Sequence, residues 1–188
     1  SNIEVIDATS TIANNTTTLT LSQAFMDNNG GAILIDGNET ANSGGNHVIN
    51  ASTVSTGVVT FQTEGNTTAK NDTFYGGGGD DILVVGTTLQ TAASAAEWEA
   101  ADVFDGNGGI DQFSAVSSAS TTSQLDFATV TDVEKFVLTK DGAGVTTVTL
   151  TAVATTTTVP TTFTVDGSVV ATSTGALMWN DGDDNSIS

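Results

Sequence analysis

The sequence predicts an all-β protein, a parallel β-helix or β-roll-like solenoid with additional β-strand segments and one short inserted helix at about 91–101. A nine-residue pattern of glycines, an aspartate and a large apolar residue occurs in two places, which indicates short strands joined by tight turns. Short apolar runs separated by Gly and Asn turns fill the first 66 residues. Threonine runs such as 155–158 also favour strands, because the branched side chain is stiff.

Residues 1–66 form a predicted β-rich N-terminal region. Its apolar runs include 18–21 and 57–61, and turn residues separate them. The segment 45–49 fits a degenerate turn of the solenoid, with His47 where an aspartate stands elsewhere. His47 is the single histidine and no cysteine accompanies it, so we expect a structural or solvent-facing role rather than a transition-metal site.

The predicted central region, 67–114, carries the nine-residue pattern. Residues 76–84 match Gly-Gly-x-Gly-x-Asp-x-apolar-x at every fixed position. Glycines allow the turn backbone angles that other residues cannot adopt, the aspartate offers a hard oxygen ligand, and the apolar residue points inward. The same spacing of nine separates two pairs of aspartates: Asp72 and Asp81, and Asp102 and Asp111.

The pattern resembles the calcium-binding nonapeptide of RTX repeat proteins, specifically at 71–84 and well at 101–114, or about 30 residues of the chain. Asn107 departs from the pattern by replacing a glycine, and the glycines are lost at 67–70. The resemblance implies Ca²⁺ as the cofactor and export from a bacterium through a C-terminal signal. It implies a ligand set of carboxylates and backbone carbonyls: Asp72, Gly76, Gly78, Asp80, Asp81, Asp102, Gly106, Gly108 and Asp111.

The spacing of the two glycine loops predicts an insertion between them. The loops 76–81 and 106–111 begin 30 residues apart, which equals one β-roll turn of about 18 residues plus a 12-residue excursion. The alanine- and glutamate-rich segment 91–101 has about that length. Ser94 with Glu97 makes a helix capping box there, so the excursion is the predicted helix.

The same geometry predicts how the aspartates are arranged. We expect the helix to leave the roll on the side of Asp72 and Asp102, which face each other there. The loops ending in Asp81 and Asp111 should then stack directly on the other side. Four large apolar residues should stack in the interior: Phe74, Leu83, Phe104 and Phe113.

Residues 115–188 form a predicted Thr-rich β region, and the three regions together fit one continuous domain equally well. Residues 125–139 resemble, more loosely, the V-T-x-V-E-x-x-x-L-T segments of bacterial S-layer and large RTX surface proteins. Segments 145–153 and 163–170 alternate in the strand period. The acidic segment 179–187 fits either a worn turn of the solenoid or a polar tail.

Composition excludes several classes of partner. The chain has 22 acidic residues against three lysines, a formal net charge of −19. We expect no nucleic-acid partner and no membrane insertion, because phosphate-rich surfaces bind Lys and Arg and no apolar run is long enough for a membrane helix. The acids stand beside glycine in turns, which favours divalent cations over an acidic surface that serves solubility alone. Without cysteine the chain forms no disulfide or thiolate site.

We expect no enzymatic activity. With one histidine and no cysteine a Cys/His pair is excluded, and no catalytic-triad context surrounds His47. A paired-carboxylate glycosidase stays open from the sequence alone, although calcium ligation explains acids in glycine turns better.

The expected function is that of an extracellular calcium-binding structural protein. It would be a self-assembling S-layer, filament or matrix subunit of a bacterium, secreted to the cell surface, with calcium driving folding and assembly. Its expected partners are further copies of the chain, as a homo-oligomer or polymer, and a cell-surface glycan or lipopolysaccharide. The alternative is an RTX module that stiffens or exports a larger secreted adhesin or toxin.

Overall fold

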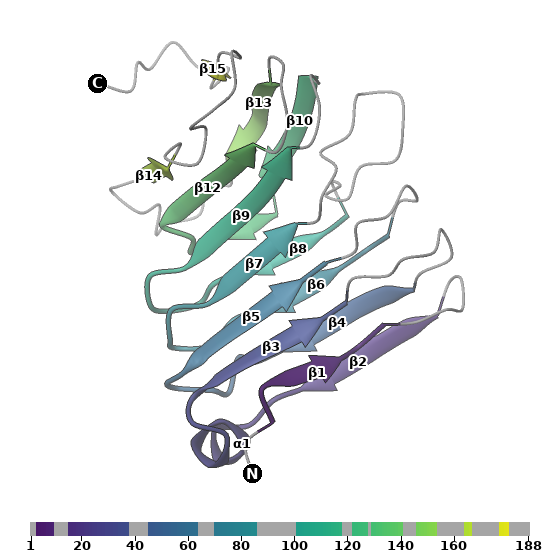
Figure 1. The fold of residues 1–188 in the computed structure, drawn as a ribbon, viewed down its shortest axis with the longest axis vertical. Helices are drawn as coiled ribbons and strands as arrows, with labels where there is room; N and C mark the ends of the chain where they lie inside the picture. Colours follow the sequence, from purple (N-terminus) through teal and green to yellow (C-terminus); the bar gives the residue numbers. More distant parts are fainter. Residues whose placement is uncertain are drawn as a thin grey trace.

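The computed structural model describes residues 3–9, 15–37, 45–63, 70–85, 101–117, 122–127, 129–140, 146–153, 164–166 and 177–180. Within them the chain is nearly all β, as predicted, and coils into a parallel solenoid (Figure 1). All strand pairs found there are parallel. In these ranges no helix has the length and apolar character needed to cross a membrane.

Two sheets form the walls of the solenoid, and successive turns pass through each in order. Sheet A stacks β1 (Val5–Asp7), β3 (Ala32–Asp36), β5 (Val58–Gln62), β7 (Ile82–Val85), β9 (Gln112–Ser117), β12 (Lys135–Lys140) and β14 (Thr164–Asp166). Sheet B stacks β2 (Thr16–Thr20), β4 (Asn46–Asn50), β6 (Thr73–Tyr75), β8 (Val103–Asp105) and β11 (Val130–Thr131). Sheet A therefore contains strands from all three regions that the sequence suggested.

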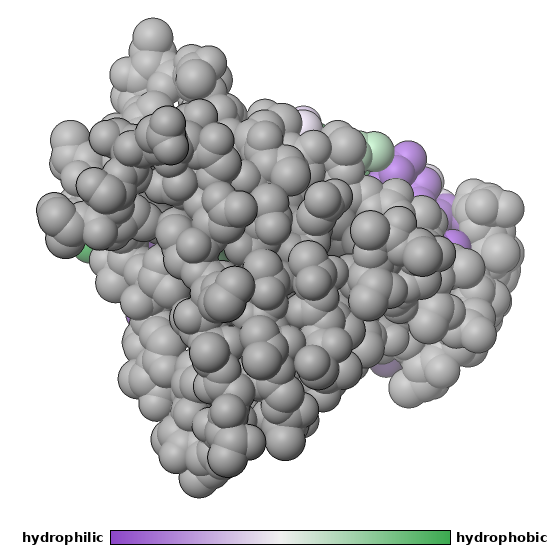
Figure 2. Space-filling model, turned by 90° about the horizontal axis from the view of Figure 1, so that it is seen from above, coloured by the Kyte–Doolittle hydropathy of each residue, from purple (hydrophilic) through white to green (hydrophobic). Residues whose placement is uncertain are grey.

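The cross-section changes after β9, where a third sheet begins. This sheet stacks β10 (Thr122–Phe127), β13 (Thr146–Val153) and β15 (Leu177–Asn180). It provides the additional strand segments that were predicted, toward the C-terminal part of the chain (Figure 1). Seen from above (Figure 2), the visible described residues include a hydrophilic group along one edge of the molecule.

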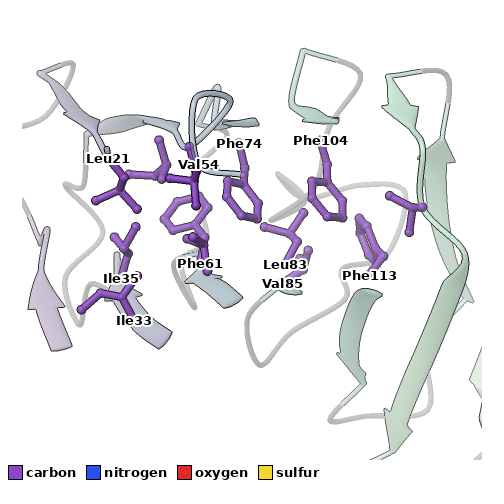
Figure 3. Packing of buried hydrophobic residues seen from close by; sticks show 14 of the residues in the cluster. Leu21, Ile33, Ile35, Val54, Phe61, Phe74, Leu83, Val85, Phe104 and Phe113 are labelled. Carbon is purple, nitrogen blue, oxygen red and sulfur yellow. The ribbon is translucent and has the colours of Figure 1, made fainter. Parts of the chain in front are cut away.

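The core lies between sheets A and B. Side chains along β3, β4, β5 and β7 alternate between buried and partly exposed positions, because successive strand residues point to opposite faces. The inward side chains of the two walls meet in one narrow layer (Figure 3). The four residues predicted to point inward are all at most 1% exposed, which confirms the prediction: Phe74, Leu83, Phe104 and Phe113.

Large inward side chains stack from turn to turn. In sheet B, Phe74 lies in register with Phe104, and their rings are parallel within 2° with centroids 5.2 Å apart. In sheet A, Phe113 is in register with Leu83 on one side and Phe136 on the other. Burying each such side chain contributes roughly 1.5–3 kcal/mol, so these rows hold the parallel register.

The turns of the solenoid are longer than the expected 18 residues. Thr60 in β5 pairs with Ile82 in β7, 22 positions later, and Phe113 in β9 pairs with Phe136 in β12, 23 positions later. The 30 positions from Ile82 to Gln112 equal the predicted length of the turn that contains the insertion. The expectation of an 18-residue turn is therefore wrong for this chain. The additional residues lie in the connections between strands, where extra length costs little closure entropy.

In the order of the strands, the insertion between the two glycine loops falls in the connection that was predicted to carry it. β7 ends at Val85 and β8 begins at Val103, so the insertion joins sheet A to sheet B on the side of Asp72 and Asp102. The helix predicted at 91–101 lies outside the described residues, apart from a turn at Ala101.

A short helix that the sequence analysis did not predict, α1 (Gln23–Asn28), joins β2 to β3. Ser22 caps it, because the Ser22 hydroxyl accepts the N–H of Phe25. Met26 is fully buried against the core. Six residues are too few to form a helix by propensity, so this helix depends on its cap and on Met26.

Candidate functional site

Two connections from sheet B to sheet A stack directly on each other. The loop 76–81 joins β6 to β7, and the loop 106–111 joins β8 to β9. The N–H of Gly108 donates to the carbonyl oxygen of Gly77 at 3.0 Å, so the backbones are in contact. The stacking predicted from the spacing of the two loops is confirmed.

This close approach requires glycine at three stacked positions, one in each of three successive turns. A Cβ added to Gly79 would meet the carbonyl oxygen of Gly57 in the turn before, and one added to Gly109 would meet Gly79. Gly57 and Gly109 also have φ values of 120° and 127°, which side chains disfavour. The three glycines form a column in which backbone packs on backbone.

Gly79→Ala is expected to destabilise the protein by about 3 kcal/mol, because a backbone oxygen cannot move aside for the new methyl group. Gly108→Ala is the matched control, since its Cβ would lie 3.9 Å from the nearest heavy atom, the Cα of Gly78. Urea unfolding of both variants in chelator-containing buffer measures the difference. Equal stabilities would contradict the close approach.

A column of three acidic side chains, Asp81, Asp111 and Glu134, lies at this corner, and we call it the carboxylate column. Asp81 Oδ1 accepts the backbone N–H of Val59 at 2.7 Å, and Asp111 Oδ1 accepts that of Asp81 at 2.7 Å. Glu134 Oε2 accepts the N–H of Asp111, also at 2.7 Å. Each carboxylate thus satisfies a backbone donor of the preceding turn, next to the point where strand pairing begins.

A second column on the opposite side contains His47, Asp72 and Asp102. Asp72 Oδ1 accepts the backbone N–H of His47 at 2.8 Å, and Asp102 Oδ1 accepts that of Asp72 at 2.7 Å. His47 thus stands at an aspartate position, as its sequence context suggested. Its buried ring lies 3.2 Å from Asp72 Oδ1 through Nδ1 and 3.1 Å from the Ala8 carbonyl through Nε2, which gives it a structural role.

The two aspartates of the carboxylate column differ in their second oxygen. Asp81 Oδ2 accepts the N–H of Gly77 at 2.5 Å, whereas Asp111 Oδ2 is buried and has no hydrogen-bond partner. The cause is Asn107, which stands where Gly77 stands in the preceding loop. Asn107 has a φ of 64°, and its N–H donates instead to Asp105 at 3.2 Å. Because buried polar atoms are rarely left unpaired, Asp111 Oδ2 is the point in these loops that calls for a proton or a cation.

Electrostatics agree with this contrast. Burial raises the pKa of Asp81 to about 6, although two backbone N–H groups act to lower it. Burial raises the pKa of Asp111 further, to about 8, and the negative charges of Asp81, Glu134 and Asp80 add to the increase. A buried carboxylate beside other negative charges favours a bound proton or cation over free ionisation.

The predicted metal ligands lie in three different settings in the structure. Asp72 and Asp102 lie in the second column, on the opposite side of the solenoid from the glycine loops. Asp80 is exposed, and its Oδ1 accepts the N–H of Ile110 at 2.9 Å. The remaining residues are brought together by the stacked loops: Gly76, Gly78, Asp81, Gly106, Gly108 and Asp111.

Oxygen atoms converge where the two loops meet. The position of a Cβ on Gly76 lies 2.6 Å from Asp81 Oδ2 and 2.6 Å from the carbonyl oxygen of Gly106. Among the residues that the structure describes, no three acidic or histidine side chains gather as a ready metal site. A cation at this corner must therefore take backbone carbonyls as ligands, as Ca²⁺ commonly does, and the all-oxygen donor set fits such a hard ion.

Glu134 belongs to the carboxylate column although no sequence pattern assigned it to the site. It lies in the turn between β11 and β12, which has no glycine loop. The available signal was the V-E pair within the looser motif at 125–139. Glu134 follows the short strand β11, and its carboxylate occupies the position that an aspartate occupies in the preceding turns of the carboxylate column.

Comparison of the chain with protein-family models, curated proteins and solved structures found no match. The functional inference therefore depends on the residues and the geometry of the two columns.

Proposed function

We propose that this chain is an extracellular calcium-binding structural protein, a self-assembling S-layer or filament subunit of a bacterium. Calcium would bind at the stacked glycine loops and stiffen the solenoid outside the cell. The observation that carries the proposal is the convergence of Asp81 Oδ2 and the Gly106 carbonyl oxygen where the two loops meet. The resemblance of these loops to the RTX nonapeptide supports calcium as the ion.

Charge supports the same ion. With a formal charge of −19 the chain repels itself, and compaction places acidic side chains in buried positions. A divalent cation held by Asp81, Asp111 and neighbouring carbonyls would offset this repulsion. Metal binding is then coupled to folding, because the ligands come from successive turns and meet only in the folded chain.

Self-assembly is supported by the outer face of sheet A. Among the described residues, its outward apolar side chains include Val5, Leu34, Val58, Ile82 and Val84, which are partly or largely exposed. Exposed apolar side chains gathered on one flat sheet are typical of contact surfaces. Copies of the chain packing through this face would form a lattice or fibre.

The test is a calorimetric titration of the purified chain with CaCl₂, followed by light scattering and electron microscopy. We expect saturable binding at calcium concentrations up to on the order of millimolar, as for extracellular calcium modules, and ordered sheets or fibres in its presence. Absence of binding would overturn the proposal. Binding that leaves a compact monomer would overturn the assembly part and favour the alternative, a stiffening module of a larger adhesin or toxin.

A further inference from the structure

We propose that a second calcium ion binds at the corner between the loop 106–111 and the turn 131–134, held by Asp111 Oδ2, the Asp132 carbonyl oxygen and Glu134. We call this corner the boundary site, because the nine-residue pattern ends there. The inference depends on the proposed function only in taking calcium as the ion. Its ligands Asp132 and Glu134 lie outside every glycine loop.

The first support is the direction of the Asp111 side chain. Asp111 is 1% exposed, and its Oδ1 faces back to the N–H of Asp81. Its unpaired Oδ2 lies against Gly106, and so does the carbonyl oxygen of Asp132 from the next turn. Asp111 Oδ2 and the Asp132 carbonyl oxygen thus lie on the same side of Gly106, as Asp81 Oδ2 and the Gly106 carbonyl oxygen both lie beside Gly76 one turn earlier.

The second support is the position of Glu134. Its Oε2 is tied to the N–H of Asp111 at 2.7 Å, which holds the glutamate carboxylate beside the aspartate. The charge of Glu134 is among those that raise the pKa of Asp111. Two carboxylates and one carbonyl give an oxygen-only ligand set, to which water can add, as calcium prefers.

The boundary site would join the glycine loops to the strands that follow. The carbonyl of Asp111 accepts the N–H groups of Glu134 at 3.1 Å and Lys135 at 2.9 Å, and β12 starts at Lys135. An ion bound by Asp111 and Glu134 would fix the same junction through the side chains. Calcium would then order β12 as well as the loops.

The experiment is a calorimetric calcium titration of the full chain and three variants. Glu134→Gln keeps an oxygen for the Asp111 N–H but removes a charged ligand, so one calcium ion fewer per chain is expected. Asp111 is a ligand at both corners, so Asp111→Asn should take up fewer ions than Asp81→Asn, and its amide group can donate to the Asp132 carbonyl. Asp81→Asn is the control, since it alters the corner between the glycine loops and should leave the boundary ion bound.

The outcomes separate the two proposals. No calcium uptake by the unaltered chain would overturn both. If Glu134→Gln takes up as many ions as the unaltered chain with the same affinity, the boundary site is wrong while the proposed function stands. Circular dichroism at saturating calcium checks that each variant is folded. If Glu134→Gln does not fold, the comparison of Asp111→Asn with Asp81→Asn decides, and equal ion uptake by these two variants would contradict the boundary site.

Discussion

Replacing both Asp81 and Asp111 by alanine is expected to abolish the gain of β-signal in circular dichroism that the proposed calcium binding would cause. The two aspartates supply the carboxylates at the stacked loops, and backbone carbonyls alone bind calcium weakly. The same change removes the acceptors of the Val59 and Asp81 N–H groups, which lie at 2.7 Å from their carboxylates. The alanine variant should therefore be less stable even in the absence of metal.

The double asparagine variant is the matched control for this experiment. Asparagine keeps a side-chain oxygen for the N–H groups of Val59 and Asp81 but carries no charge, so it should also lose the calcium response. Both variants are neutral and both lose the acceptor of the Gly77 N–H, so their difference in stability reports mainly the Val59 and Asp81 hydrogen bonds. Leaving two buried N–H groups unpaired costs roughly 1–3 kcal/mol each, so the alanine pair should unfold more easily by that sum. An unchanged calcium response in either variant would remove the ligand assignment.

The stacking of the aspartates could be predicted because it follows from equal spacing. Asp72 to Asp102 and Asp81 to Asp111 are each 30 residues apart, so an insertion of any shape on one side leaves both pairs aligned. The interior position of Phe74 likewise follows from the strand period. These features depend on local pattern and on repetition, and both can be read directly from the sequence.

The length of the turns and the role of Glu134 could not be predicted in the same way. Longer loops cost little closure entropy. No residue type is therefore needed in a 22-residue turn that would distinguish it from an 18-residue turn. Glu134 enters the carboxylate column only because β11 places its turn above Asp111. Asp111 Oδ2 has no hydrogen-bond partner because Asn107 adopts a positive φ. The sequence shows that Asn107 replaces a glycine, but it does not determine this backbone angle.

In calcium-free buffer the solenoid is expected to lose stability as the pH rises from about 4 to about 8. The pKa values of Asp81 and Asp111 are raised from 3.8 to about 6 and about 8 in the folded chain. The folded chain thus holds protons that the unfolded chain releases near pH 4, so this stabilisation is present at low pH and is lost through the folded pKa values. One pKa unit corresponds to about 1.4 kcal/mol, so pKa values raised by about 2 and about 4 give an upper bound on the total loss on the order of 8 kcal/mol.

Asp111→Asn separates the two contributions to this pH dependence. It removes the group that titrates near pH 8 and keeps an acceptor for the Asp81 N–H, so stability should fall between about pH 4 and 6 and then level off. Urea unfolding at a series of pH values, with chelator present, measures both curves. Stability that rises through this window, or an unchanged slope in the variant above pH 6, would contradict the assignment. Calcium should change the pH dependence of stability in the opposite sense, because a carboxylate must lose its proton to bind a metal. The ion should therefore stabilise the fold most at high pH, where the metal-free chain is least stable.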